Sequence, residues 1–500
     1  MAGVLLWQHS LMAASCTSTK SKPTLGVYRP RRPQDTSLHK IVRENLETFL
    51  ACAREECPDH DPIPKHVEKT FRKYLQCGVL CWGAGRCRCA SCGHDFLVGF
   101  SCKGRGLCPS CSQKRMVLTA AHLVDYVLPR VAVRQWVLAV PKRIRAYLQH
   151  NPKIEGAVTR IMMRAVQTSV RRASPDAPKG SQFGAVTFSQ RFGSTLNANN
   201  HVHSIVLDGV FSENENGEAK FFEATELGKE VVEKTGQQIR QRVLRYLKKQ
   251  GVLEPHEAED MLTWEHGGGF SLDASVKISG WDRDGLEKLA RYCARPSFAE
   301  QRLSQTEKNQ VLYVFPKPTV DGRLYAEMDP LVFLQKLSAI IPPPWVNLVK
   351  YFGVLAPNAK LRAKVVATAG PSEAVRKQLL EAARKMGLAT DSIPGGPGPQ
   401  DGTGSATAQG QDASAPPEEP KPQKKPKKKA TLVWAMLIAR VYEALPLTCI
   451  RCGGPMKIIA FITATDELTK ILTHLGEPTE PPVISPARGP PQHDLFDGAA

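Results

Sequence analysis

Residues 77–111 read CGVLCWGAGRCRCASCGHDFLVGFSCKGRGLCPSC, and this stretch holds eight of the fourteen cysteines of the chain. Four of the eight have the spacing Cys89-x2-Cys92-x15-Cys108-x2-Cys111. Each Cys-x-x-Cys pair can present two thiolates from a tight turn, and four thiolates complete a tetrahedral shell around Zn2+. We therefore predict a structural zinc site at these four cysteines, with no open position for chemistry.

The remaining cysteines of this stretch leave the ligand set open. Cys77 and Cys102 are candidates to replace one of the four or to bind a second ion, as are Cys81, Cys87 and His94. A disulfide framework is the alternative, but nothing marks a chain of 500 residues as a small secreted scaffold. Between the two knuckles, Lys103 and Arg105 stand in a glycine-rich turn that would point their charges outward.

The formal net charge of the chain is +19 at pH 7. A protein with this charge is attracted to polyanions, because neutralising phosphates releases counterions. A soluble protein with a merely basic surface would have the same charge. The charge therefore supports nucleic-acid binding only if a binding site is also present. We find no apolar run of about eighteen residues, which argues against a membrane-spanning helix. Residues 17–36 are Pro-rich and basic, and Arg31 and Arg32 within them suit phosphate contacts.

Changes in composition divide the chain into five parts. We expect a disordered basic leader at 1–36, a helical and zinc-binding domain at 37–125 and a large domain of strands and helices at 126–390. A linker rich in Pro, Gly and Lys follows at 391–429, and a C-terminal segment at 430–500. Within the third part, helices are predicted at 153–172 and 226–250, and strands at 183–189 and 201–207. Strands so close together predict an α+β fold with an antiparallel or mixed sheet and packed helices.

The C-terminal segment carries one further knuckle, Cys449-x2-Cys452. These cysteines supply only two ligands, and no second pair follows them. Two interpretations of this pair are possible: it contributes to a zinc site between domains, or it is two free thiols.

The strand at 201–207 begins with His201-Val202-His203. Side chains two apart on a strand point to the same face, so both imidazoles can bind one cation. Two hydrogen-bonded structural histidines would fit the pattern equally well. A divalent ion needs a third ligand, and Gln190 at the end of the preceding strand is our candidate. Asp208 lies on the opposite face by alternation.

A helix from about Asp284 to Pro296 carries Tyr292 on the border between its apolar and basic sides. Lys288 and Arg295 lie about one turn to either side and could hold a phosphate or stabilise a phenolate. An ordinary boundary tyrosine is the alternative. Tyr351, next to Lys350, is the rival nucleophile.

In this order, the cysteine cluster, the His-hydrophobe-His strand and the tyrosine in a basic helix resemble the rolling-circle transposases of the insertion-sequence-91 family and its common-region relatives. The resemblance covers about residues 28–365. Its segments are Tyr28 to Pro33, Phe100 to Cys111, Gly184 to Phe188, Gln190 to Gly193, His201 to His203, Asp208 to Val210, Tyr292 to Pro296 and Tyr351 to Asn358.

The resemblance implies an HUH nuclease domain with a ferredoxin-like core behind the zinc-binding module. It implies Mg2+ or Mn2+ on His201, His203 and Gln190, and attack by Tyr292 on single-stranded DNA at transposon ends to give a 5′-phosphotyrosine. DNA contacts are expected from Arg31, Arg32, Lys103, Arg105 and Arg191.

Two departures from the family pattern bear on the chemistry. Lys288 stands where some members have a second tyrosine, which implies a single-tyrosine enzyme. Arg295 replaces a lysine that is frequent in related nucleases, and a guanidinium can contact phosphate but is a poor proton donor.

The resemblance also implies a cellular setting. Host replication machinery would extend the free 3′-hydroxyl, and we expect a protein of the prokaryotic cytoplasm, associated with the nucleoid and not with a membrane. A zinc-dependent, sequence-specific DNA-binding regulator without catalysis and a metallohydrolase that uses bound water are the rival functions.

Overall fold

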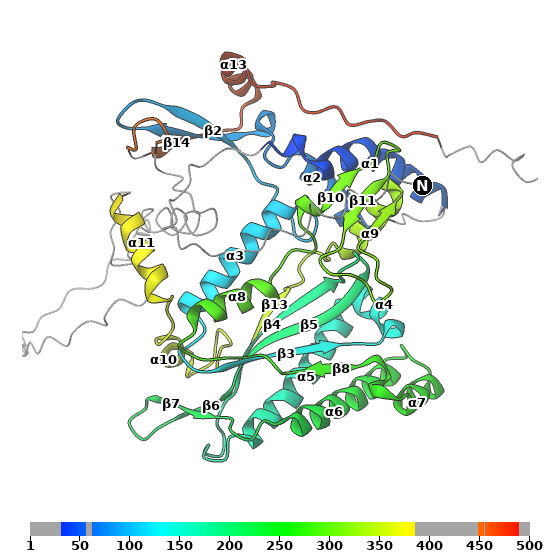
Figure 1. Ribbon diagram of the computed structural model, residues 1–500, viewed down its shortest axis with the longest axis vertical. Helices are drawn as coiled ribbons and strands as arrows, with labels where there is room; N and C mark the ends of the chain where they lie inside the picture. The colour runs from blue at the N-terminus through cyan, green and yellow to red at the C-terminus, as the bar shows by residue number, and fades with distance from the viewer. Residues whose placement is uncertain (1–31, 57–62, 386–448, 455, 490–500) are drawn as a thin grey trace, which may run out of the picture.

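The computed structural model describes residues 32–56, 63–385, 449–454 and 456–489 (Figure 1). Its centre is an antiparallel sheet in which the strands lie in the order β13-β4-β5-β3-β8, with β9 also paired to β3. Their bounds are β3 Val133–Ala139, β4 Gly184–Phe192, β5 Ala198–Leu207, β8 Ser271–Asp273, β9 Lys277–Ile278 and β13 Val349–Gly353. The predicted α+β class is confirmed.

Helices cover both faces of this sheet (Figure 1). On one face lie α3 (Pro109–Tyr126) and α8 (Arg283–Cys293), which share a core with Val186 and Ile205. The other face carries α4 (Lys142–His150), α5 (Pro152–Arg172) and α6 (Lys229–Lys249), packed on Trp136 and Val206. Because side chains alternate along a strand, β5 contributes to both cores. Buried strands of this kind read as nearly continuous apolar runs.

Local signals explain where the helices begin. The Asn151 side chain accepts hydrogen bonds from the backbone of Lys153 (3.0 Å) and Ile154 (3.3 Å), and so caps α5. Asp282 caps α8 in the same way through the backbone of Gly285 at 2.8 Å. These helices match the predictions at 153–172 and from about Asp284.

The cysteine-rich module shares a core with a peripheral part of the catalytic region. Leu46 of α1, Phe71 of α2, Tyr313 of β11 and Phe333 of α9 belong to one buried cluster. The elements of this part are α1 Ser37–Glu56, α2 Lys65–Leu75, β1 Ala84–Cys89, β2 Asp95–Gly99, β10 Leu303–Gln305, β11 Val311–Val314, β12 Tyr325–Met328 and α9 Pro330–Ile340.

The C-terminal segment returns to the N-terminal module. Strand β14 (Met456–Ile462) pairs with β1, which also pairs with β2, and α13 (Thr465–Leu475) follows (Figure 1). The chain then runs along α1, where the Ser485 backbone donates to the Arg43 carbonyl at 3.1 Å. The C-terminal segment therefore packs against β1 and α1, which lie far from it in the sequence.

The other described elements complete the outline: 3-10 turns η1 Pro33–Asp35, η2 Leu80–Trp82, η3 His266–Gly269 and η4 Glu300–Arg302; strands β6 Gly209–Glu213 and β7 Ala219–Glu223; helices α7 Pro255–Thr263, α10 Arg362–Val366 and α11 Glu373–Lys385. Arg31 and the expected linker at 391–429 lie outside the described residues. Within the described ranges, no helix has the length and apolarity needed to cross a membrane.

Candidate active site and metal centres

His201 and His203 lie on the face of β5 that α3 and α8 cover. Their ring centroids are 4.9 Å apart, and His203 is buried. The register places Gln190 of β4 opposite His201. The alternation predicted from sequence therefore brings the two imidazoles and Gln190 together on one side of the sheet.

Neighbouring groups orient both rings. His201 Nδ1 lies 2.9 Å from the Asn199 carbonyl oxygen, which can only accept, so this nitrogen donates and Nε2 keeps its lone pair. His203 Nδ1 lies 2.9 Å from the side-chain amide of Gln135. Burial lowers the pKa of both imidazoles, to about 3 for His203, and the charge of Arg295 acts in the same direction. Both rings are therefore neutral at pH 7.

Gln190 joins the sheet to the end of α8. Its amide nitrogen donates to the carbonyl oxygens of Tyr292 at 3.2 Å and of Cys293 at 2.8 Å. Its amide oxygen is buried and has no hydrogen-bond partner among the described residues. A buried oxygen without a partner is costly, so this atom is available for a ligand.

Tyr292 lies in the last turn of α8, directly over the histidines. Its ring stands edge-on to His203, with centroids 5.3 Å apart and planes at 87°, and the side chain is 46% exposed. The Arg295 guanidinium lies 4.9 Å from the Tyr292 ring centroid, just beyond the end of the helix. Lys288 is exposed one turn earlier and has no ion pair among the described side chains.

Tyr351 has different surroundings. It lies on β13, half-buried against the core beneath α3 and α8, and the Arg362 guanidinium is 5.9 Å from its ring centroid. Burial raises the pKa of its phenol. A buried phenol with a raised pKa is a poorer nucleophile than an exposed one.

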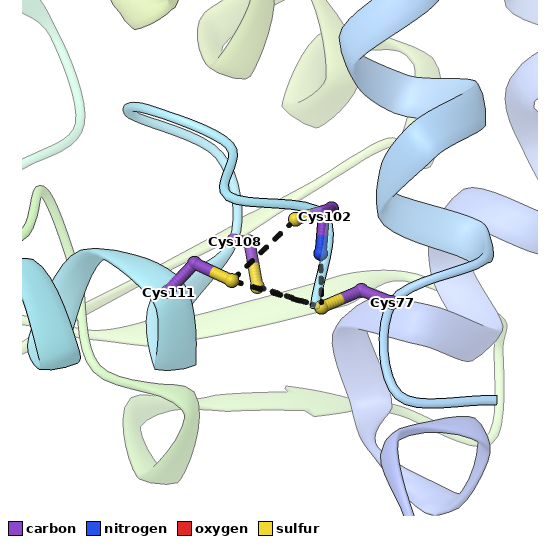
Figure 2. Close-up of side chains that lie close together, drawn as sticks. All are labelled: Cys77, Cys102, Cys108 and Cys111. Atoms are coloured by element: carbon purple, nitrogen blue, oxygen red, sulfur yellow. Dashed lines mark hydrogen bonds between the residues drawn. The ribbon is translucent and has the colours of Figure 1, made fainter. Parts of the chain in front are cut away.

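Cys77, Cys102, Cys108 and Cys111 form one four-cysteine cluster, shown in Figure 2. The sulfur–sulfur distances are 3.8 Å from Cys77 to Cys108, 3.7 Å from Cys77 to Cys111 and 3.6 Å from Cys102 to Cys111. A tetrahedron with Zn–S bonds of about 2.3 Å has edges of about 3.8 Å. The cluster therefore fits a zinc ion and is far too wide for a disulfide.

Cys89, Cys92, Cys449 and Cys452 form the second cluster. Its sulfur atoms are 3.5 Å apart between Cys89 and Cys452 and between Cys92 and Cys449. Backbone N–H groups of Arg451 and Gly454 point at the Cys449 and Cys452 sulfurs at 3.4 Å, as is usual for thiolates in a knuckle. The role of Cys449 and Cys452 was open from the sequence. In the structure they join Cys89 and Cys92 in a zinc-type site.

The predicted grouping of Cys89, Cys92, Cys108 and Cys111 in one site is wrong. The first pair lies at the β1–β2 turn and the second at the start of α3, and β2 separates them. Cys89 and Cys92 are completed by Cys449 and Cys452, which lie far away in the sequence. Cys108 and Cys111 are completed by Cys77 and Cys102, two of the candidates from the same stretch. Cys81 and Cys87 belong to neither cluster, and burial raises the pKa of both thiols.

The first cluster is joined to the tyrosine region. Cys108 directly precedes α3, which packs against α8. The Ser297 hydroxyl, five residues beyond Tyr292, donates to the Gly106 carbonyl at 3.0 Å. A metal at this cluster would therefore hold the loop and helix that support Tyr292.

Comparison with known families agrees with this geometry. A family model described as "Transposase zinc-binding domain" matches residues 41–140, and one described as "Putative transposase" matches residues 184–362. The chain belongs to the transposases of the insertion-sequence-91 type. No curated protein and no solved structure matches it.

The two matches divide the functional residues of this transposase. The first cluster falls in the zinc-binding match, which together with the cluster geometry supports structural zinc. Gln190, His201, His203 and Tyr292 fall in the transposase match. Cys449 and Cys452 lie outside both matches. The second cluster therefore combines Cys89 and Cys92, which lie inside the zinc-binding match, with two cysteines that neither match includes.

The residues expected to contact DNA have varied environments in the transposase. Lys103 is exposed, and Arg32 is exposed but pairs with Glu477 at 3.4 Å. Arg105 is instead held by backbone carbonyls, which corrects the expectation that it points outward.

Arg191 is largely buried. It is 5% exposed, donates to the Gln149 carbonyl, and lies 3.7 Å from the buried carboxylate of Glu155. It also lines a pocket beside the end of α8, and its contact with DNA stays a prediction.

Sequence reasoning missed Gln135, the partner of His203. Its signal is a buried amide in β3, since a polar side chain in a core strand needs a hydrogen-bond partner.

Proposed function

We propose that this transposase cleaves and rejoins single-stranded DNA at transposon ends with Tyr292 as the nucleophile. The observation that carries the proposal is the placement of the half-exposed Tyr292 ring edge-on to His203, 5.3 Å between centroids, above the pair of neutral imidazoles. The proposed enzyme requires the Tyr292 hydroxyl, whereas a regulator that only binds DNA does not.

The three side chains beneath Tyr292 fit a divalent cation. His201 offers Nε2, Gln190 offers its buried and unpartnered amide oxygen, and His203 offers Nε2 because Gln135 occupies Nδ1. Metal binding through Nε2 requires that Nδ1 carry the proton, so the Gln135 amide would present its oxygen to it. Bound Mg2+ or Mn2+ would supply Lewis-acid polarisation of the scissile phosphate.

The chain's own groups account for the transfer itself. The Tyr292 hydroxyl loses its proton as its oxygen attacks phosphorus, and the bond from phosphorus to the 3′-oxygen breaks. The 3′-oxygen takes up a proton, leaving a 5′-phosphotyrosine and a 3′-hydroxyl. Arg295 holds its positive charge 4.9 Å from the Tyr292 ring centroid, where it can contact the scissile phosphate. One phosphodiester replaces another, so attack by a second 3′-hydroxyl can rejoin strands.

These products suggest how the mobile DNA element is transposed. The free 3′-hydroxyl can prime replacement synthesis by the host replication machinery, as in rolling-circle transposition. Such an enzyme works at the nucleoid of a prokaryotic cell.

The test is formation of a covalent adduct with single-stranded oligonucleotides that tile the DNA flanking the gene, in Mn2+, on a denaturing gel. The wild-type chain should give a shifted band. Tyr292→Phe should bind the same DNA and give no band, because it lacks the attacking oxygen. Tyr351→Phe is the matched control and should still form the adduct.

The other outcomes identify the rivals. Cleavage without an adduct would indicate a metallohydrolase, and binding without cleavage would indicate a regulator. Mapping the trapped DNA to any tyrosine other than Tyr292 would overturn the assignment.

A further inference from the structure

Trp345 is exposed in a way that folding does not explain. Its side chain is 98% exposed and its backbone has a φ of 63°. The left-handed conformation costs a residue with a side chain on the order of 1–2 kcal/mol. A large aromatic ring in water also forgoes the burial that ordinarily stabilises it. Both features are unfavourable to the free protein, so they point to something that binds there.

The loop that carries Trp345 is braced. It connects α9 to β13, and Pro342, Pro343 and Pro344 precede the tryptophan. Because proline fixes φ, this run has little freedom. The Arg105 guanidinium donates to the Pro343 carbonyl at 2.8 Å and to the Val346 carbonyl, so it clamps the chain on both sides of Trp345. The ring is therefore presented by a rigid support.

A pocket with four arginines lies between this loop and the end of α8. Its lining includes Pro342 at the loop, Arg105 and Arg115 at the cysteine-rich module, Arg191 on β4, and Gln190 and Arg295 next to Tyr292. No carboxylate is among its described lining residues. Phosphates are the anions that such a lining would attract in a DNA transposase.

We propose that Trp345 is a stacking platform for an unpaired base of single-stranded DNA whose backbone crosses this pocket toward Tyr292. Aromatic rings beside a basic groove are the usual means by which proteins hold single strands, because every base offers a flat face. Arg105 acts as a positioning residue for the platform. The inference rests on the substrate class of the proposed function and adds where that substrate is gripped.

The test measures binding of the full-length, zinc-loaded chain by fluorescence anisotropy, without added Mg2+ or Mn2+. Two labelled strands of equal length are compared, one of thymidines and one of abasic sites, so that the phosphates are the same and only the bases differ. Trp345→Ala should weaken binding to the thymidine strand about tenfold and leave the abasic strand unaffected. Trp345→Phe should retain most of the affinity, since a ring remains.

Trp281 provides the matched control. It is 78% exposed and lies just before α8, at the opposite end from Tyr292. Trp281→Ala should bind both strands like the wild type. Equal weakening of both strands by Trp345→Ala would show a role in loop structure, and no weakening would show that the ring does not stack on DNA bases. Either result overturns the proposal. The adduct assay tests the proposed function separately, because it needs no change at Trp345.

Discussion

At the scale of single residues, the candidate site depends on which ring nitrogen each histidine presents. The Asn199 carbonyl fixes His201 through Nδ1, and the Gln135 amide contacts the same nitrogen of His203 at 2.9 Å. The Asn199 contact leaves the Nε2 lone pair of His201 for a ligand, and His203 offers Nε2 when the Gln135 amide turns its oxygen to Nδ1. Partners behind a metal-binding histidine usually set its orientation and basicity. Gln135 is also 3.6 Å from the Cys293 sulfur, so it ties His203 to the helix that carries Tyr292.

We therefore predict that Gln135→Leu impairs metal use and leaves DNA binding intact. Loss of the amide frees the His203 ring to turn, and changes of this kind weaken metal binding by about 10- to 100-fold. The measurement is the Mn2+ concentration that gives half-maximal adduct, which should rise by about that factor. At saturating Mn2+ much of the adduct should return, whereas Tyr292→Phe should give none at any concentration. An unchanged Mn2+ dependence would show that Gln135 does not position His203.

Residue by residue, the sequence predicted the parts of the site that depend on local periodicity. Alternation put His201 and His203 on one face, the end of the preceding strand supplied Gln190, and helical spacing put Tyr292 at a boundary position. The burial of Arg191 could not be predicted, because its partner Glu155 lies on another element and a sequence does not show which arginine pairs with a buried carboxylate. Cys89 and Cys108 were grouped wrongly because the partners of Cys89 include the distant Cys449 and Cys452. Cys108 is completed by the nearer Cys77 and Cys102.

At the scale of elements, β13 sets the edge of the central sheet beside β4, the strand that carries Gln190. It ends at Gly353, whose φ is +59°. A Cβ atom built there would lie 1.9 Å from the Phe183 carbonyl oxygen. The close approach of two backbones at this point therefore requires a residue without a side chain. The sequence predicted β4 and β5 well but not the pairing of β13, because about 150 residues separate it from its partner.

Gly353→Ala should be strongly destabilising for this reason. The substitution adds left-handed strain of about 1–2 kcal/mol and a clash with backbone that cannot move without displacing β4. We expect a loss of about 3 kcal/mol or more in unfolding free energy, measured by urea titration.

Gly322→Ala separates the two contributions. Gly322 has a φ of +79° and open space around it, so alanine there adds strain without a clash. It should cost only about 1 kcal/mol. Similar losses in both variants would mean that the β13 edge tolerates displacement.

At the scale of the whole molecule, the C-terminal segment is attached to the N-terminal module. Cys92 and Cys449 are 357 residues apart in sequence and 3.5 Å apart at their sulfurs, and β14 pairs with β1 beside them. Neither cysteine pair is a complete site alone, so a metal at this cluster would tie the C-terminal segment to the N-terminal module. The first cluster has all its ligands within residues 77–111 and contacts the active-site side of the molecule. A metal at the first cluster would thus support the Tyr292 region, and a metal at the second would hold the C-terminal segment in place.

The last prediction follows from this division. The purified chain should contain two Zn2+, and Cys452→Ser should contain one, because three thiolates and a hydroxyl hold zinc poorly. Without zinc at the second cluster, a protease should remove the C-terminal segment far faster, since structural zinc contributes on the order of 10 kcal/mol to folding stability. Adduct formation should persist, because the described contacts of the Tyr292 region run to the first cluster. Cys108→Ser should lose the adduct, and Cys81→Ser, outside both clusters, should keep both ions. Two ions retained in Cys452→Ser would disprove this role of the second cluster.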